Sequence, residues 1–129
     1  MFNWKIYFFI FLIFFSGKAL AFEIYECKIY KTNPYLDLNQ YKYPPVQIRL
    51  DFKKKKVYPF NDFKLFNINF TNQQVSWSHI SINPVNNLEQ ISFTYFDIQQ
   101  KLLQINTFPN KQNLVASDLL IQVFGRCGK

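Results

Sequence analysis

The sequence predicts an all-β fold, an antiparallel meander of about eight short strands that closes into a small barrel. In several runs apolar and polar residues alternate with a period of two, which is typical of half-buried strands. β-Branched and aromatic residues fill these runs, whereas Asn, Pro and Lys fill the gaps between them. No segment has a convincing helical period, and residues 112–120, the best helix candidate, favour a loop that enters the last strand.

The clearest expected strands cover residues 25–29, 46–52, 66–70, 91–95 and 120–127, and noisier ones cover 56–60, 74–82 and 101–108. The alternation places the following residues on the inward faces of the clearest strands: Tyr25, Cys27, Ile29, Val46, Ile48, Leu50, Phe52, Phe66, Ile68, Phe70, Ile91, Phe93, Tyr95, Ile121, Val123 and Cys127. Within 74–82 the pattern changes parity between Trp77 and Ile80, which predicts a β-bulge at Ser78 and His79.

Short strands in succession favour antiparallel pairing between neighbours, and eight of them are sufficient to close a small barrel. A sandwich of two sheets is the alternative architecture. With Phe66, Phe70, Trp77 and Phe93 directed inwards, we expect such a barrel to be filled by its own side chains.

The first 21 residues have the features of a secretory signal peptide. Lys5 supplies the positive charge, residues 6–15 form an apolar run, and Ala19 and Ala21 supply small residues for cleavage before Phe22. As a helix this run would be about 15 Å long, half the core of a bilayer, so a transmembrane anchor is disfavoured. We therefore expect residues 22–129 to form a single domain that is exported to the periplasm or secreted, with no membrane span after signal removal.

The two cysteines lie in the first and last expected strands, at Cys27 and Cys127. In an oxidising compartment such a pair forms a disulfide, and closing a loop of about 100 residues stabilises the fold by up to ~4.7 kcal/mol. A metal or redox pair is disfavoured, because the chain has no Cys-x-x-Cys and no histidine beside a cysteine. In a barrel these two strands are neighbours, so the bridge would lock the N-terminal strand to the C-terminal one.

Residues 53–56 are four consecutive lysines in a chain of formal net charge +7. They lie between two expected strands, where a turn would place them in solvent. Binding of nucleic acid would be better supported by basic residues spread over one face between aromatic ones, so we disfavour a nucleic-acid partner.

The sequence contains no recognisable catalytic or metal-binding arrangement. His79 is the only histidine, and none of the three glycines belongs to a nucleophile elbow or a phosphate-binding loop. The carboxylates lack the spacing of a calcium loop. We therefore expect no catalytic residue, cofactor or metal, and we interpret His79 as an ordinary strand residue.

One long connection, residues 32–45, is rich in tyrosine and proline. Loops of this length are often functional, and tyrosine offers a large contact area with few rotatable bonds. The predicted binding residues are Tyr35, Tyr41 and Tyr43. Two interpretations stay open: the loop is a contact surface with exposed tyrosines, or it is a lid whose tyrosines plug the core.

The order of signal peptide, Tyr-x-Cys strand, about eight strands and terminal Gly-x-Cys resembles that of small exported bacterial β-barrel proteins, among them the periplasmic lysozyme inhibitors. The Ser-Gly-centred inhibitory loop expected of those inhibitors is missing, so that activity is not carried over. We expect a monomeric, non-catalytic binding or interaction module whose partner is a protein or a small ligand. The alternatives are a small-ligand carrier of the barrel type and a structural protein of the cell envelope.

Overall fold

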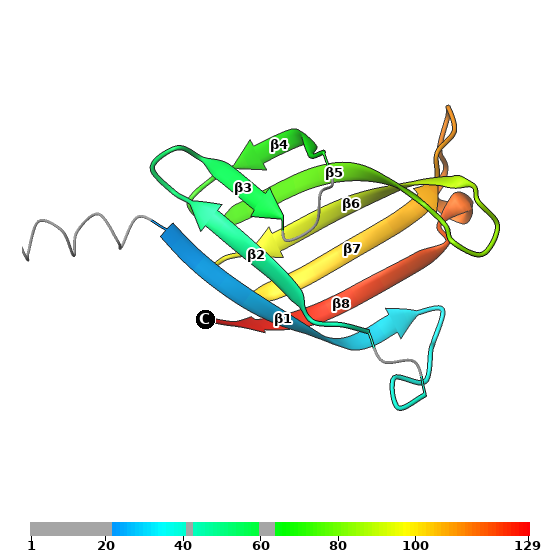
Figure 1. The fold of residues 1–129 in the computed structure, drawn as a ribbon, viewed down its shortest axis with the longest axis horizontal. Coiled ribbons are helices and arrows are strands. Elements are labelled where there is room, and N and C mark those ends of the chain that lie inside the picture. The colour runs from blue at the N-terminus through cyan, green and yellow to red at the C-terminus, as the bar shows by residue number, and fades with distance from the viewer. Residues whose placement is uncertain (1–21, 41–42, 60–63) are drawn as a thin grey trace, which may run out of the picture.

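The computed structural model describes residues 22–40, 43–59 and 64–129, which form one antiparallel sheet of eight strands (Figure 1). The strands are β1 (Phe22–Asn33), β2 (Val46–Asp51), β3 (Lys56–Pro59), β4 (Phe66–Phe70), β5 (Gln74–Ile82), β6 (Glu89–Asp97), β7 (Leu102–Pro109) and β8 (Ile121–Gly128). The prediction of an all-β fold with eight strands is confirmed. The expected signal peptide lies outside the described residues.

Helix is almost absent from the described part of the chain. Its one helical element is a 3₁₀ turn, Ala116–Asp118, within the loop that leads into β8. None of the described helical structure is long and apolar enough to span a lipid bilayer.

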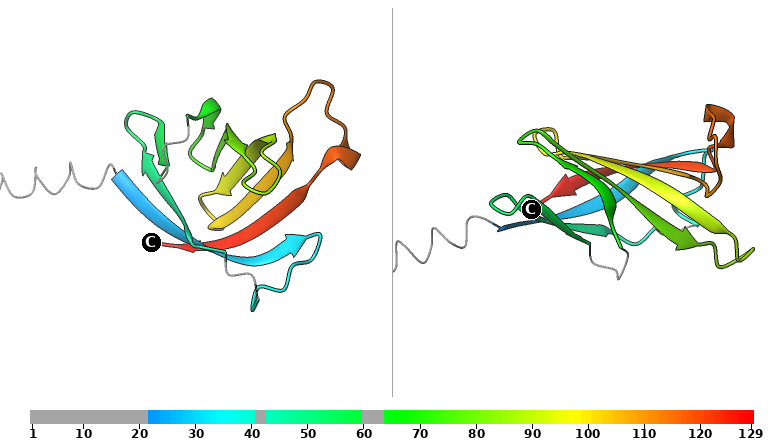
Figure 2. Two further views of the ribbon diagram at one scale, coloured as in Figure 1. Left: turned by 45° about the vertical axis from the view of Figure 1, so that its right-hand side comes forward. Right: turned by 90° about the horizontal axis from the view of Figure 1, so that it is seen from above.

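The strands follow the order β3-β2-β1-β8-β7-β6-β5-β4, so every pair of neighbours in sequence except β3 and β4 is also a pair in the sheet. The sheet curls until the two end strands approach each other, which gives a nearly closed barrel (Figure 2). The predicted meander and the pairing of first with last strand are confirmed, and the sandwich alternative is not found.

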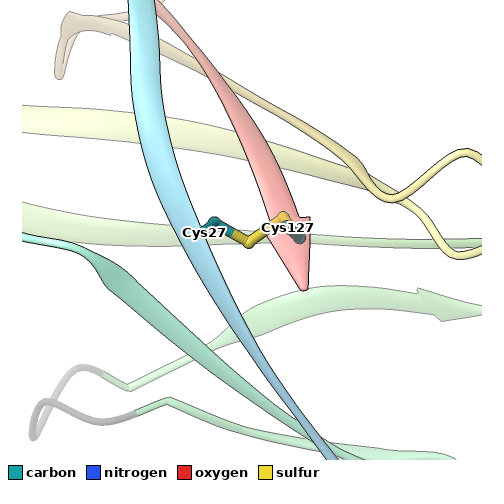
Figure 3. The surroundings of a disulfide bond; sticks show 2 residues. All are labelled: Cys27 and Cys127. Atoms are coloured by element: carbon teal, nitrogen blue, oxygen red, sulfur yellow. A yellow bond between two sulfur atoms is a disulfide. The ribbon is translucent and has the colours of Figure 1, made fainter. Parts of the chain in front are cut away.

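The pairing of β1 with β8, here called the seam, carries the predicted disulfide. Cys27 and Cys127 lie opposite each other in the register and are bonded through their sulfur atoms (Figure 3). Beside them, Lys129 Nζ lies 2.7 Å from Glu23 Oε1, and the Tyr25 hydroxyl donates a hydrogen bond to Glu23 Oε2. Partial burial opposes ionisation of Glu23, but these two hydrogen bonds outweigh it and hold the pKa of this carboxyl below its usual value.

One end of the barrel is packed with aromatic side chains. Tyr25 and Phe96 are fully buried and meet edge to face with ring centroids 5.0 Å apart. Phe52 and Phe70 make a second edge-to-face contact, at 5.4 Å, against the same cluster. This end of the barrel is therefore closed by its own core.

The turn between β2 and β3 holds the lysine run. All four lysines are exposed, and the backbone N–H of Lys54 donates to Asp51 Oδ1 at 3.0 Å. Lys55 adopts a positive φ of 52°, as the reversal of the chain requires. Lys53, Lys54 and Lys55 therefore lie in the turn, as predicted, and Lys56 begins β3.

The face of strand β6 that lies inside the barrel is opposite to the one predicted. Ser92, Thr94 and Phe96 are buried, whereas Tyr95 is 40% exposed. Thr94 faces Trp77 on β5 across the register, and the same register continues along the whole strand pair. The prediction that Ile91, Phe93 and Tyr95 face inwards is therefore wrong. Both faces of this strand carry apolar residues, and the inward face is set by the cross-strand partners of Phe96.

Strand β4 also departs from its predicted pattern. The register between β4 and β5 shifts between Phe66 and Asn69, and Asn67 has a positive φ of 53°. Phe70 consequently pairs with the buried Val75, whereas Phe66 pairs with Ser78, on the face of β5 that carries Ile80. Phe66 therefore lies on the opposite face from the one predicted, and Ile68 of the same strand is exposed.

The predicted β-bulge at Ser78 and His79 is wrong. Strands β5 and β6 pair without interruption from Gln74 to Ile82, and the irregularity belongs to the β4–β5 pair. Val75, Trp77 and His79 continue one face, and Ile80 and Ile82 lie exposed on the other. The change in parity thus reflects an apolar outer face and not an extra residue in the strand.

Neighbouring residues of β6 provide a test of this register. Replacing the fully buried Phe96 by alanine should cost about 3–5 kcal/mol of unfolding free energy. Replacing Tyr95 by alanine should cost about 1 kcal/mol or less, because its ring is part of the outer face. Urea titrations of the two variants measure the unfolding free energies. A larger loss of unfolding free energy for Tyr95→Ala than for Phe96→Ala would show that the inward face of β6 is assigned wrongly.

Candidate functional site

A pocket of about 450 Å³ lies on the inner side of the sheet, next to the aromatic cluster, with which it shares Ile48, Val57 and Trp77. One wall comes from β2 and β3, and the opposite wall comes from β5, β6 and β7. The inward-facing residues that line the pocket are Val46, Ile48, Val57, Trp77, His79, Thr94 and Ile105, together with Leu65 before β4.

This space exists because the interior is less filled than the sequence suggests. Phe66 and Phe93, both expected inside, belong to the outer faces of β4 and β6. Thr94 takes the inward position between Trp77 and Ile105 in the register. A threonine side chain is much smaller than phenylalanine, so the expectation of a filled barrel is wrong at this level.

The next level of the interior is polar. His79, Ser92 and Thr107 follow one another across β5, β6 and β7, and the hydroxyls of Ser92 and Thr107 are 2.9 Å apart in a buried hydrogen bond. Because these two hydroxyls satisfy each other, they can be buried behind the pocket without the cost of an unpaired polar group.

The lining is predominantly apolar, with a few polar side chains. Thr94 and His79 contribute them on one wall, and Glu26 and Gln47, which face each other across β1 and β2, contribute them on the other side. Small-molecule sites commonly combine an apolar enclosure with a few placed polar groups that fix the orientation of the ligand.

Burial lowers the pKa of His79 from its ordinary value of 6.5. The imidazole is therefore neutral at neutral pH, and a neutral imidazole carries one hydrogen-bond donor and one acceptor. Within residues 22–40, 43–59 and 64–129, no group of three or more His, Cys, Asp and Glu side chains is placed to hold a metal ion. His79 offers a polar contact in the pocket.

Two of the three predicted binding residues, Tyr35 and Tyr43, lie in the described part of the chain. Tyr35 projects into solvent with 82% of its surface exposed, and Tyr43 is 39% exposed and lies at the pocket beside Pro44 and Pro45. Tyr41 lies outside the described residues. Both described tyrosines have the exposure that a contact surface requires, and their role in binding stays a prediction.

The start of the long loop is held by Thr32, which is buried at the end of β1. Its hydroxyl accepts a hydrogen bond from the backbone N–H of Leu36 at 2.8 Å and donates one to the carbonyl of Pro34 at 3.0 Å. This double contact fixes the turn from which Tyr35 projects.

Sequence reasoning did not find the pocket, because its residues come from six different strands. Trp77 was expected inside, but no pattern within one strand indicates that Thr94 and Ile105 face it. The available signal was Phe96: placing this residue in the core would have turned Thr94 inwards as well.

The depressed pKa of His79 predicts a pH dependence of stability. Below pH 6.5 the unfolded chain binds a proton that the folded chain does not, so the unfolding free energy should fall as the pH drops from 7.5 to 5.5. The slope from one group is at most about 1.4 kcal/mol per pH unit. Urea titrations of the native protein and of His79→Gln check this, and an equal decline in both would contradict the assignment.

The chain has no match among protein-family models, curated proteins or solved structures.

Proposed function

We propose that this protein is a non-catalytic binding barrel that carries one small, predominantly apolar molecule in the pocket between β2–β3 and β5–β7. The observation that supports this most is the partly open space of about 450 Å³ that is lined mainly by inward-facing side chains. Sites for small molecules typically measure about 300–1,000 Å³. The space therefore suits one compact ligand.

The side chains suggest how such a ligand would lie. Val57, Trp77 and Ile105 would contact its apolar body from both walls, and each 100 Å² of apolar surface removed from water contributes about 2.5 kcal/mol. Thr94 and the neutral His79 would hydrogen-bond one polar group of the ligand. The preferred ligand is thus an apolar body with one uncharged hydrogen-bonding group.

Export of the protein is part of this proposal. The disulfide between Cys27 and Cys127 supports it, because such bonds form and persist in oxidising compartments. The apolar run at residues 6–15 supports it from the sequence side. A carrier in this location would hold an apolar molecule that water dissolves poorly.

A second candidate function is an interaction module that contacts a protein through residues 32–45. The exposure of Tyr35, at 82%, favours it, since an interface anchor must be available to its partner. Tyr43 would belong to both functions because it lies at the pocket.

Binding of the neutral fluorophore N-phenyl-1-naphthylamine tests the carrier function, because this probe has an apolar body and one N–H group. We expect saturable binding to the native protein with enhanced fluorescence. Ile105→Trp, which fills the pocket from β7, should weaken binding at least about tenfold, a change of 1.4 kcal/mol. Asn106→Trp is the matched control, since the next residue of the strand faces the other way and its substitution should leave the affinity unchanged.

Circular dichroism and the urea midpoint establish that each variant is folded. Val57→Phe fills the same space from β3 and replaces Ile105→Trp if that variant unfolds. Failure of the native protein to bind the probe, or equal affinities for Ile105→Trp and Asn106→Trp, would overturn the proposed function.

A further inference from the structure

A groove of about 400 Å³ lies on the outer face of the sheet, across β7 and beside the turn from β6 to β7. Leu102 and Gln104 of β7 lie at its centre. Tyr95 of β6 lines one side, and Phe124 of β8 with Tyr30 of β1 lines the other. The groove therefore has aromatic side chains on both sides of a floor that is part apolar and part polar.

The spacing of the two sides follows from the register. Tyr95 and Phe124 each lie directly opposite Gln104, so their backbones are two strand spacings apart, about 9.6 Å. A flat ring in contact with an aromatic side chain on either side needs about 7–8 Å. The two aromatic side chains thus flank Gln104 at a backbone spacing that is compatible with one six-membered ring.

Apart from Leu103, the remaining side chains of the groove are hydrogen-bonding groups. Gln74 lies opposite Asp97 in the register, and Gln100 follows in the turn, where its backbone N–H donates to Asp97 Oδ1 at 2.9 Å. Three glutamine amides supply both donors and acceptors, and a carboxylate accepts up to about four hydrogen bonds. This set matches a ring whose rim carries several hydroxyl groups.

We propose that this groove binds a saccharide unit of a neutral glycan, with the sugar ring between Tyr95 and Phe124. The apolar C–H face of the ring would lie against the aromatic side chains, and its hydroxyls would bond to Gln104, Asp97 and the neighbouring amides. Tyr95 is 40% exposed, so its ring is available to a ligand.

Two cations lie near the groove, and we still propose a neutral glycan as its ligand. Lys31 Nζ lies 5.4 Å from the centre of the Phe124 ring, and the Arg126 guanidinium lies 4.6 Å from that of Tyr30. Both cations thus lie over the aromatic rings of one wall. Asp97 at the other end would accept hydrogen bonds from sugar hydroxyls, which a phosphodiester cannot donate, so we choose a neutral glycan over single-stranded nucleic acid.

Amide chemical shifts of the ¹⁵N-labelled, disulfide-bonded protein test the proposal. The probes are cellotetraose, maltotetraose and chitotetraose, which differ in linkage and ring substituent, and a ten-residue oligothymidylate. We expect at least one tetrasaccharide to shift the amides of Tyr95, Gln104 and Phe124, and the oligothymidylate to leave them in place at physiological salt.

Variants of one residue sharpen the test. Tyr95→Ala should weaken saccharide binding about fivefold to tenfold, and Tyr95→Phe, which keeps the ring, should stay within about twofold of the native protein. Tyr58→Ala is the matched control, because Tyr58 on β3 is 37% exposed and lies outside the groove. Binding that ignores Tyr95→Ala, the absence of shifts with all three tetrasaccharides, or shifts with the oligothymidylate alone would overturn the proposal.

The groove and the inner pocket lie on opposite sides of the sheet, so the two proposals fail independently. Ile105→Trp should leave the saccharide affinity unchanged even though it blocks the inner pocket. A parallel loss of both activities in this variant would contradict separate sites.

Discussion

The pairing of β1 with β8 holds two parts of the barrel together that the chain builds separately. Strands β1 to β3 form one part and β4 to β8 the other, and β3 and β4 are the two ends of the sheet order. The disulfide bridges a sequence separation of 100 residues at this seam, which in the chain-entropy model stabilises the fold by up to about 4.7 kcal/mol. The inner pocket depends on the seam directly, because Val57 belongs to the first part and Trp77, Thr94 and Ile105 belong to the second. A slip of β1 against β8 would separate these walls.

The space inside follows from which face of β6 turns inwards. Phe96 packs on Tyr25 in the closed end, and this contact fixes Thr94 and Ser92 on the same inner face. Phe93 is then left outside, where its ring meets that of Phe108 at 5.7 Å. The same choice of face places Tyr95 in the outer groove. A single register thus leaves room inside the barrel and presents an aromatic side chain outside it.

The sequence alone was sufficient for the fold class and for the seam, because alternation in β2 and β8 is clean and two cysteines allow only one intramolecular pair. It failed for β6 and β4 for a common reason. Alternation within one strand identifies two faces but does not say which is inside when both are apolar, as with Phe93 and Phe96. In β4 the inward face depends on a local register shift near Asn67, which the residue types do not specify. The pocket was therefore beyond prediction. The sequence also left open whether the tyrosines of the loop at 32–45 are exposed or buried, and the structure exposes Tyr35.

Mass spectrometry under non-denaturing conditions, on protein purified from its natural host, tests the central claim that the barrel encloses a ligand. The account predicts that the native protein carries an additional small-molecule mass, which disappears on denaturation. It also predicts that Ile105→Trp, folded and disulfide-bonded, shows the mass of the polypeptide alone. Native protein that matches the polypeptide mass without any addition, or an equal addition in both proteins, would contradict it.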